Sequence, residues 1–382
     1  MKKSFDVKEI FSRFKGLVTI GTSDIIGGGI SALFWIYVAT LFDADGYGQL
    51  FYFFAIGNIV SSVSLIGSKN TLLVYVPKQI KLDTSIFLLV IIIGSISSLI
   101  VFLIYSESVV GLYIFGSIVF GLGASEILGK KLYSNYFVYL MIQKFSMVGL
   151  SLGLYYLIGF NGIILGISLS FFTYIPIIFT EFKTTKIDFS LLKPRLKFMM
   201  ESFGQHLTTT LWGQLDKLLI VPLLGFAFLG NFQLGLQFIA VFQLVPFIVL
   251  KYTLPHDANG NPNKNLKLLV ILFSIFSAVL VIFLAPVIIP IFFEKFEYVV
   301  DIIQILAVSL IPLSVNTVYA SKFLGSEKSR IFLIGHIISL LVYVLGIIVL
   351  GSIFGIIGVA ISHVIGATTL SVYYVIIDKK IF

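Results

Sequence analysis

The sequence predicts an all-α polytopic membrane protein with about twelve transmembrane helices in two six-helix lobes. Of the 382 residues, 58% are hydrophobic and only 12% are charged, and the mean hydropathy is +1.06. Soluble domains carry roughly twice that share of charged residues. The apolar residues occur in runs of about 20, the length that a helix needs to cross a bilayer. The basic residues in the connections predict the orientation of the chain in the membrane, and internal repeats predict the two lobes.

The apolar runs divide the chain into expected spans that are separated by short connections. No segment alternates apolar and polar residues over about ten positions, as the strands of a membrane β-barrel do. The fifth run is short, so its helix is open to an earlier start in the preceding segment. The expected spans are residues 17–41, 47–66, 85–105, 109–128, 145–159, 162–182, 202–224, 228–250, 267–290, 299–321, 331–350 and 353–377.

Basic residues follow the connections in a regular way. Of the 26 Lys and Arg residues, 24 fall in the two terminal segments and in the connections after even-numbered spans. Cytoplasmic loops are enriched in Lys and Arg, so we expect a multi-pass protein of the cell membrane with both termini in the cytoplasm. The exceptions are Lys217, inside a span, and Lys295, on the outer side. The pI of 9.3 therefore reflects topology, and no nucleic-acid partner is expected.

The chain repeats itself, which predicts two lobes at 1–190 and 191–382. The segment DADGYGQL can be laid on the region of FAFLGNFQ at an offset of 182 residues, which pairs Gly48 with Gly230. Each lobe then holds six spans, an even number, so that both lobes begin on the same side of the membrane. Parallel repeats of this kind place a cavity between the lobes, with the first and seventh helices as natural lining.

A second pair of segments supports the same repeat. GFNGIILGISLS resembles SIFGIIGVAIS, which pairs Gly162 with Gly355 and Gly166 with Gly358 after a one-residue gap. Small residues also recur by chance in membrane helices, because close helix packing requires them. The two matches and the even helix count together favour a real repeat.

The stretch 199–224 is long enough for a span but is unusually polar. On a helix, Gln205, Trp212 and Asp216 share one face. Charged residues at bilayer depth usually face a bundle interior or a wet cavity, so this helix is predicted to line a solute pathway. The alternative is an Asp–Lys pair near one end, with Lys217 reaching toward the interface. The candidate cavity residues of this helix are Gln205, His206, Gln214, Asp216 and Lys217.

Asp24 is the remaining candidate and lies in the Gly-rich segment TIGTSDIIGGG of the first span, with little polar company along the sequence. It is either a carboxylate that binds a proton or cation, or a cap for a broken helix. The alignment that pairs Gly48 with Gly230 also pairs Asp24 with His206. Lys217 is the expected contact for an anionic head group, because it is the only cation placed inside a span. Four amides are expected to join neighbouring helices: Asn58, Gln143, Gln304 and Asn316.

Several stretches carry a family resemblance that covers almost the whole chain. They are LFDADGYGQLFYFFAIGNIVSSVSLIG, LWGQLDKLLIVPLLGFAFLGNFQLGLQF, LAVSLIPLSVNTVYASKFLGSEKSR and FGIIGVAISHVIG. They resemble the polysaccharide-type lipid-linked oligosaccharide flippases of the multidrug/oligosaccharidyl-lipid/polysaccharide exporter superfamily. The resemblance implies a V-shaped central cavity, alternating access, and movement of a polyprenyl-linked sugar from the inner to the outer leaflet. No arginine lies inside an expected span of this chain.

The expected function is therefore a flippase for polyprenyl-linked oligosaccharide in surface polysaccharide or glycan assembly. The expected partners are the lipid-linked glycan, membrane lipids, a proton or sodium ion, and glycan-synthesis enzymes. A cation-coupled small-molecule or drug exporter of the same superfamily, with Asp24 and Asp216 as coupling carboxylates, is the alternative. A membrane-embedded glycosyltransferase is a weaker one, because Glu126, Asp188 and Glu201 are scattered.

Motifs of enzymes are absent from the sequence. There is no phosphate-binding GK[ST] loop, so no ATPase activity is expected. Cysteine is absent and no His/Glu cluster has metal-ligand spacing, so neither a metal nor a cofactor is predicted.

Overall fold

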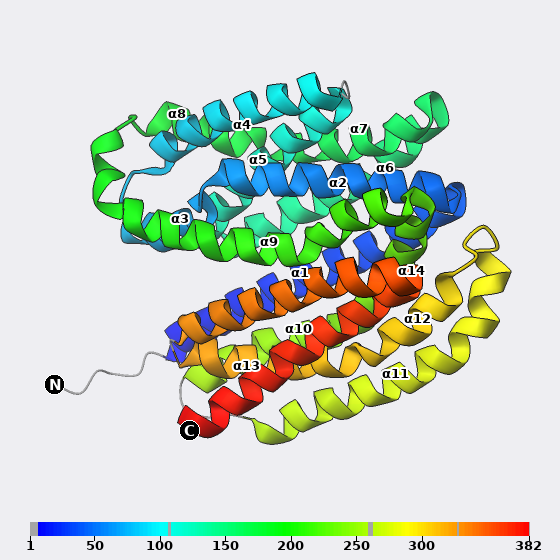
Figure 1. The fold of residues 1–382 in the computed structure, drawn as a ribbon. Coiled ribbons are helices and arrows are strands. Elements are labelled where there is room, and N and C mark those ends of the chain that lie inside the picture. The colour runs from blue at the N-terminus through cyan, green and yellow to red at the C-terminus, as the bar shows by residue number, and fades with distance from the viewer. Residues whose placement is uncertain (1–6, 106–107, 259–262, 327, 382) are drawn as a thin grey trace. The chain divides into compact units, whose positions relative to one another are not determined.

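The computed structural model describes residues 7–105, 108–258, 263–326 and 328–381, and these residues contain helices and connections but no strand (Figure 1). The chain forms two compact units. Unit 1 comprises the described parts of Met1–Ile30 and Gly57–Leu207, and unit 2 those of Ser31–Ile56 and Thr208–Phe382. These units differ from the predicted lobes mainly in the hairpin 31–56, which packs with unit 2. That the lobes 1–190 and 191–382 move as two separate bodies stays a prediction, and so does the V-shaped cavity.

The first half of the chain contributes helices α1 to α8. Apolar side chains of α4, α5 and α7 pack the centre of unit 1, where Ile86, Ile118 and Ile163 are fully buried. The α-helices are α1 (Val7–Leu41), α2 (Ala44–Leu65), α3 (Ser68–Tyr75), α4 (Asp83–Tyr105), α5 (Ser108–Gly129), α6 (Tyr133–Ile158), α7 (Phe160–Phe171) and α8 (Ile175–Thr184). Short 3-10 turns are η1 (Val76–Lys78) and η2 (Phe172–Tyr174).

The second half contributes helices α9 to α14, and α9 passes from unit 1 into unit 2 after Leu207. Asn263 caps α11, because its side-chain oxygen accepts a 3.0 Å hydrogen bond from the backbone N–H of Leu266. The elements are η3 (Phe189–Leu191), η4 (Lys193–Arg195), α9 (Leu196–Leu224), α10 (Phe226–Ala258), α11 (Lys264–Phe292), α12 (Val299–Val308), α13 (Leu310–Gly325) and α14 (Ser329–Ile381).

The predicted number of spans agrees with the helices. Ten stretches of the described residues are long and apolar enough to cross a membrane. The last of them, Arg330–Lys380, divides in two at Gly355, where a φ of 59° interrupts the helix. α9, with 29 residues, has the length of a further span, although its polar residues keep it out of the ten. Together these give twelve spans, and the chain is a multi-pass membrane protein.

The fifth predicted span begins too late. The sequence suggested 145–159, whereas α6 starts at Tyr133 and is a candidate span over its whole length to Ile158. Polar residues such as Gln143 and Lys144 hid this start, since they lower the hydropathy of the segment. Lys144 therefore lies inside a helix that spans the membrane and is not a loop residue.

The first repeat is confirmed by a reciprocal contact between α2 and α10. A Cβ on Gly48 would come within 2.0 Å of the carbonyl oxygen of Phe226. A Cβ on Gly230 would come within 1.8 Å of the carbonyl oxygen of Ala44. The alignment that pairs Gly48 with Gly230 also pairs Ala44 with Phe226. Gly48 therefore contacts Phe226 in the same way that Gly230 contacts Ala44, with the two repeats exchanged. Such isologous contacts are the sign of a two-fold relation.

The second repeat is real, but its predicted register is wrong. Gly159 and Gly355 both adopt positive φ, with φ, ψ values of 70°, −142° and 59°, −140°. Shortly after each turn, Gly162 lies against the backbone of Leu154 and Gly358 against that of Leu350. The correct register therefore pairs Gly159 with Gly355, and Gly162 pairs with Gly358 rather than with Gly355. Glycine spacing alone could not separate these registers, because backbone conformation decides which glycine makes the turn.

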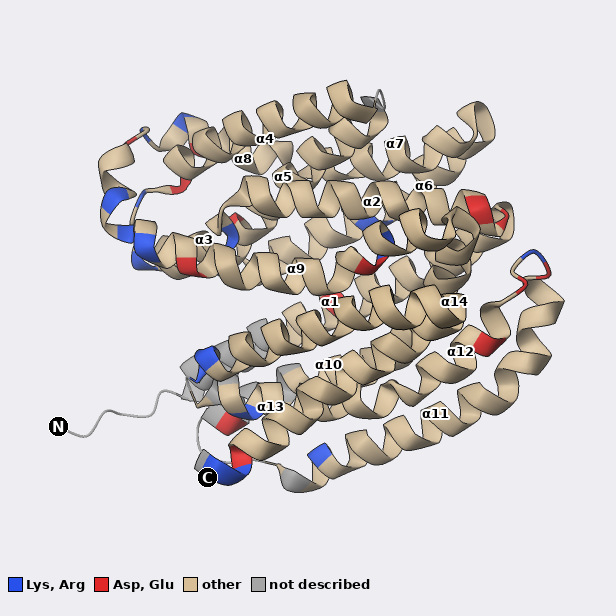
Figure 2. Cartoon of the chain, in the orientation of Figure 1, with Lys and Arg blue, Asp and Glu red and all other residues tan. Residues whose placement is uncertain are grey.

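Charged residues gather at particular ends of each unit. Figure 2 shows that Lys and Arg of unit 1 cluster at the end that carries α3 and the α8–α9 connection. In unit 2 they cluster near the C-terminus and the start of α11.

The four predicted amide contacts between helices are also present. The hydrogen bonds are Tyr113 Oη to Asn58 Oδ1 at 2.8 Å, Gln143 Nε2 to Ser170 Oγ at 3.0 Å, Gln304 Nε2 to Ile282 O at 3.1 Å, and Asn316 Nδ2 to Ala367 O at 3.0 Å.

Candidate functional site

Asp24 lies in a polar cluster within unit 1. The hydroxyl of Tyr136, on α6, donates a 2.9 Å hydrogen bond to Asp24 Oδ1 on α1. Tyr174, between α7 and α8, is fully buried and close enough for its hydroxyl to interact electrostatically with Asp24. The sequence suggested little polar company for Asp24, and this was wrong because its partners come from helices that lie far from α1 along the chain.

Lys144 completes this cluster. Its side chain lies across α1 at Gly27, where a Cβ would come within 3.6 Å of the Lys144 Cε atom. Its ammonium group is close enough to interact electrostatically with Asp24. The expectation that Lys217 is the only cation inside a span is therefore wrong. A carboxylate, a tyrosine hydroxyl and an ammonium group on two helices form a unit that can accept a proton or exchange its counter-ion.

The first part of α9 packs in unit 1 against α3. The Gly67 turn lies against the backbone of Met199 and Phe203. Lys69 lies close enough to His206 for their charges to interact, and its stem covers Gly121. Burial lowers the pKa of Lys69. Lys69 forms no ion pair with any residue that the structure describes, which leaves its ammonium group available for an anion.

The second part of α9 carries Asp216 and Lys217, and both side chains are buried in unit 2. The Lys217 ammonium lies 3.2 Å from Asp216 Oδ1 and donates a 2.6 Å hydrogen bond to the carbonyl oxygen of Gly213. The backbone N–H of Lys217 also donates to Asp216 Oδ1, at 2.9 Å. The alternative of an Asp–Lys pair is therefore present, but Lys217 turns back along α9 instead of reaching toward the interface.

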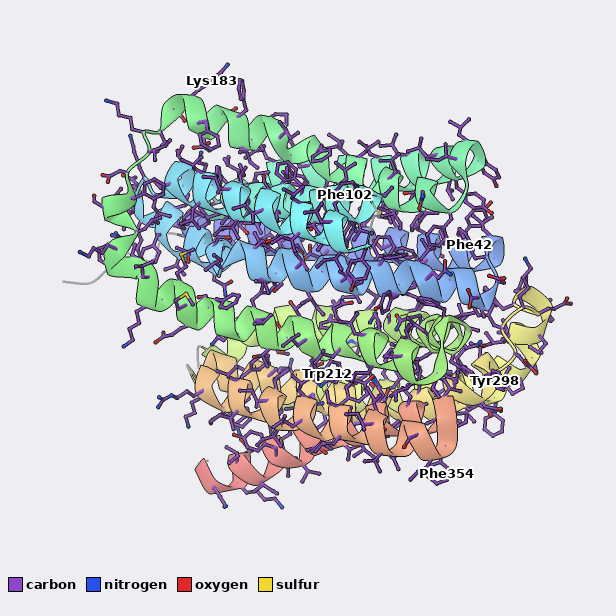
Figure 3. The ribbon with its side chains drawn as sticks, turned by 45° about the horizontal axis from the view of Figure 1, so that its top comes forward. Phe42, Phe102, Lys183, Trp212, Tyr298 and Phe354 are labelled. Carbon is purple, nitrogen blue, oxygen red and sulfur yellow. The ribbon has the colours of Figure 1, made fainter. Side chains whose placement is uncertain are left out.

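Aromatic rings enclose this ion pair. The His363 ring, on α14, lies 5.5 Å from that of Trp212 and 5.4 Å from that of Tyr343. Neither ring nitrogen of His363 has a hydrogen-bond partner, and the Tyr343 hydroxyl lies near Asp216 but outside hydrogen-bond geometry. Figure 3 shows Trp212 between the two ends of unit 2, with Phe354 and Tyr298 nearer one end. Trp212 and Asp216 thus share the face that the sequence predicted.

The six predicted cavity residues divide equally between the two units. Asp216 and Lys217 contact each other directly, and Gln214 has a buried amide oxygen without a hydrogen-bond partner. The residues in unit 1 are Asp24, Gln205 and His206, and those in unit 2 are Gln214, Asp216 and Lys217. As contacts to a transported substrate, all six stay predictions.

The sequence missed three carboxylates that the structure brings together. Asp83, Glu126 and Glu181 are all buried, and one carboxylate oxygen of each lies within 4.8 Å of the others. No spacing along the sequence signals this cluster, because the three residues stand far apart in the chain, on three different helices. The repeat could have singled out Glu126, since ASEILG at 124–129 matches ASKFLG at 320–325 with a reversed charge.

Comparisons with known proteins define the fold. A scan against protein-family models finds no match, and a search of curated proteins finds none either. Solved structures do match. An inward closed conformation of the lipid II flippase MurJ superposes with a TM-score of 0.76 at 16% identity, covering 95% of this chain and 87% of that one.

Two further structures share the fold. An inward-facing multidrug resistance MATE family transporter of the MOP superfamily gives a TM-score of 0.72 at 14% identity, over 96% of this chain and 97% of that one. A MOP superfamily transporter from Pyrococcus furiosus gives 0.64 at 13% identity, over 96% and 95%. The fold is that of polytopic membrane transporters. More particularly, it is a fold that solved structures of MOP superfamily transporters share.

Proposed function

We propose that the protein is a flippase that moves a polyprenyl-linked oligosaccharide from the inner to the outer leaflet of a cell membrane. The shared fold with a lipid II flippase supports this proposal. Buried polar groups inside the spans supply what a sugar head requires, because a hydroxyl group without a partner in hydrocarbon costs about 2–7 kcal/mol. The isoprenoid tail would stay in the surrounding lipid.

Lys69 is the observation on which the choice of substrate rests. Its ammonium group is mostly removed from water, has no anionic partner among the described residues, and lies beside His206. An unpaired buried cation is costly, and a phosphate group would compensate it. We assign Lys69 to the phosphate of the lipid carrier. Lys217 is less available for this role, because Asp216 and Gly213 already hold its ammonium group.

The orientation of the chain follows from its basic residues. Lys and Arg gather at one end of unit 1 and near the C-terminus of unit 2 (Figure 2). By the positive-inside rule these ends face the cytoplasm, and both termini with them. Lys69 would then meet the lipid-linked glycan on the side where it is made, close to the glycan-synthesis enzymes that supply it.

The second candidate function is a cation-coupled exporter of small molecules. The cluster of Asp24, Tyr136 and Lys144 favours it, because a carboxylate that alternates between a proton and an ammonium partner can couple transport to a gradient. MATE transporters share the fold. A flippase has no need of such a group if ongoing glycan synthesis maintains the substrate gradient.

Translocation in sealed vesicles separates these functions. The purified full-length protein is reconstituted with a fluorescent polyprenyl-pyrophosphate-linked oligosaccharide, and an impermeant glycosidase reports the sugar that reaches the other leaflet. We expect wild-type protein to expose the sugar, and Lys69→Gln to slow this by roughly tenfold, as for loss of one charged hydrogen bond. Lys183→Gln is the matched control, since Lys183 extends from the end of α8 over the Phe179 ring (Figure 3).

The same vesicles test coupling with and without an imposed pH or sodium gradient. If neither gradient changes the rate of transport of the lipid-linked sugar, and Asp24→Asn transports it as wild type does, the result supports passive flipping. Transport of a fluorescent organic cation, driven by a gradient and abolished in Asp24→Asn, would establish the exporter instead. If neither substrate moves, both functions are wrong.

A further inference from the structure

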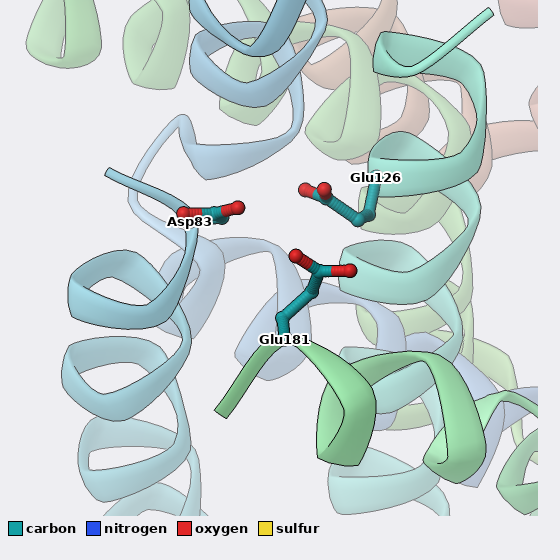
Figure 4. A group of neighbouring side chains, drawn as sticks. All are labelled: Asp83, Glu126 and Glu181. Atoms are coloured by element: carbon teal, nitrogen blue, oxygen red, sulfur yellow. The ribbon is translucent and has the colours of Figure 1, made fainter. Parts of the chain in front are cut away.

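Three buried carboxylates meet at one end of unit 1, at the ends of their helices. Asp83 begins α4, Glu126 lies one turn before the end of α5, and Glu181 lies in the last turn of α8. The exposed fractions of the three residues are 6%, 0% and 6%. Figure 4 shows the carboxylates of all three directed toward a common space, within which one oxygen of each lies within 4.8 Å of the others.

Local hydrogen bonds hold this geometry. The Thr84 hydroxyl donates to the carbonyl oxygen of Thr185 at 3.3 Å, and the N–H of Asp188 donates to Ser85 Oγ at 2.8 Å. These bonds tie the first turn of α4 to the chain that follows α8. The site is therefore built by the packing of three helices and does not depend on a loose loop.

A single lysine pairs with two of the three acids. The Lys130 ammonium lies 3.2 Å from Glu126 Oε1 and forms a hydrogen-bonded ion pair with Glu181. In the described part of the chain, no other Lys, Arg or His forms an ion pair with the three carboxylates. If all three are ionised, two negative charges remain without a counter-charge on side chains that are more than nine-tenths buried.

The carboxylate oxygens are also short of hydrogen bonds. Neither oxygen of Glu126 accepts a hydrogen bond, since Lys130 lies at ion-pair distance but outside hydrogen-bond geometry. Asp83 Oδ1 has no partner either. A buried acceptor without a partner costs roughly 1–3 kcal/mol, and more when it is charged. Three such oxygens that face one space offer acceptors to a positively charged ligand.

Unit 2 shows what the repeat places at the equivalent position. In the register that pairs Gly162 with Gly358, Ala-Ser-Glu126 of α5 corresponds to Ala-Ser-Lys322 of α13. Lys322 pairs with Asp378 at 2.5 Å, near the end of α14 where α8 has Glu181. One unit thus has an acid and a base where the other has two acids. A cation bound in unit 1 would supply the charge that Lys322 supplies in unit 2.

We propose that Asp83, Glu126 and Glu181 bind one hard divalent cation, Mg²⁺ or Ca²⁺. Both ions prefer oxygen ligands, at about 2.0–2.1 Å for Mg²⁺ and about 2.3–2.6 Å for Ca²⁺, so opposite ligands of one ion stand about 4–5 Å apart. The separation of the three carboxylates fits this range. Water would complete the shell from the side of Lys130, whose side chain is 35% exposed.

Lys130 then acts as the exchangeable counter-ion of the site. Its ammonium group lies 3.2 Å from Glu126 Oε1 and is paired with Glu181, so it competes with a metal ion for the same oxygens. Cation binding would release Lys130 to solvent and join α4, α5 and α8 at this end of the unit.

Manganese binding tests the site directly, because Mn²⁺ shares the oxygen preference of Mg²⁺ and Ca²⁺ and its free form is measured by electron paramagnetic resonance. The purified full-length protein in detergent should bind one Mn²⁺ per chain at this site, displaceable by Mg²⁺ or Ca²⁺. Glu126→Gln should weaken binding by roughly tenfold or more, because it removes a charged ligand. Lys130→Met should tighten it. Asp378→Asn in unit 2 is the matched control and should bind as wild type.

Two results would overturn the site. One is that wild-type protein binds no Mn²⁺ at millimolar concentration, and the other is that Glu126→Gln and Lys130→Met both bind as wild type. In either case the carboxylates share protons and Lys130 without a metal. Lys130→Met keeps the test valid if Glu126→Gln fails to fold, because Lys130 is partly exposed and the triad stays intact.

Discussion

The corresponding ends of the two units use different charges in the same framework. In unit 1, three carboxylates lie together and one lysine, Lys130, pairs with two of them. In unit 2, two carboxylates at this end each pair with a lysine of their own, as Lys267–Asp257 and Lys322–Asp378, both at 2.5 Å. The repeat has therefore kept the helices and changed the charge. This difference indicates that the packing of small and apolar residues defines the fold, whereas a buried charge requires only an oppositely charged group close to it.

The polar centres of the units differ in a second way. Asp24 interacts with Tyr136 and Lys144 across two helices, α1 and α6. Asp216 and Lys217 are neighbours on one helix. A charge interaction across two helices depends on their separation, so a movement of α1 against α6 would change its strength. A pair within one helix moves as a rigid body. The cluster in unit 1 is thus the better candidate for a group that responds to conformational change.

Cysteine labelling should give all-or-none differences if the units are parallel copies. The chain has no native cysteine, so single cysteines can be introduced. Asn161 in unit 1 and Ser352 in unit 2 lie at equivalent turns, and both should react fully with an impermeant reagent added outside. Ser190 and Ser329, at the opposite ends, should not react in intact cells. Opposite labelling of the two units would break the comparison, and reversed labelling of both would overturn the orientation.

The glycine crossing of α2 and α10 should show the largest loss of stability. Gly48→Ala and Gly230→Ala each place a Cβ within about 2 Å of a backbone carbonyl oxygen, so the helices must move apart. Overpacking of a well-packed site typically costs about 1–3 kcal/mol and occasionally more. We expect little folded protein by size-exclusion chromatography from either variant, and equal effects from both because the contact is reciprocal.

Gly149→Ala is the control for this crossing, since a Cβ there meets nothing within 4 Å. Alanine favours a helix over glycine by about 1 kcal/mol, so this variant should be as stable as wild type or more so. Wild-type stability of Gly48→Ala would show that the two repeats do not pack at this point.

The two ion pairs of unit 2 should contribute differently to the free energy of unfolding, because they are buried to different extents. Lys267→Ala leaves Asp257 buried, since the side chains are only 12% and 3% exposed, and should lower the free energy of unfolding by roughly 3 kcal/mol. Lys322→Ala affects a pair whose side chains are 33% and 19% exposed, and should cost under about 1 kcal/mol. Thermal unfolding of the purified variants measures both. Equal losses would mean that burial does not decide the value of these pairs.

Much of the architecture follows from the sequence alone. Hydropathy over about 20 residues is a local property, so it located the helices and, with the polar stretch in α9, their number. Adjacent residues on one helix share a neighbourhood whatever the fold, which is why the alternative of an Asp216–Lys217 pair could be read from the sequence. As cavity residues, both stay predictions. The four amides that join helices were also predicted, because an amide in an apolar span needs a partner.

Only the tertiary structure decided which distant groups meet. Hydropathy assigns Lys144 to a loop, whereas in the structure α6 begins at Tyr133 and brings Lys144 close to Asp24. Asp83, Glu126 and Glu181 are unremarkable along the chain and become a cluster only when three helix ends converge. The physical reason is that burial and charge depend on three-dimensional neighbours. Hydropathy and spacing record which residues share a helix, but packing of small residues such as Gly48 and Gly230 determines which helices touch.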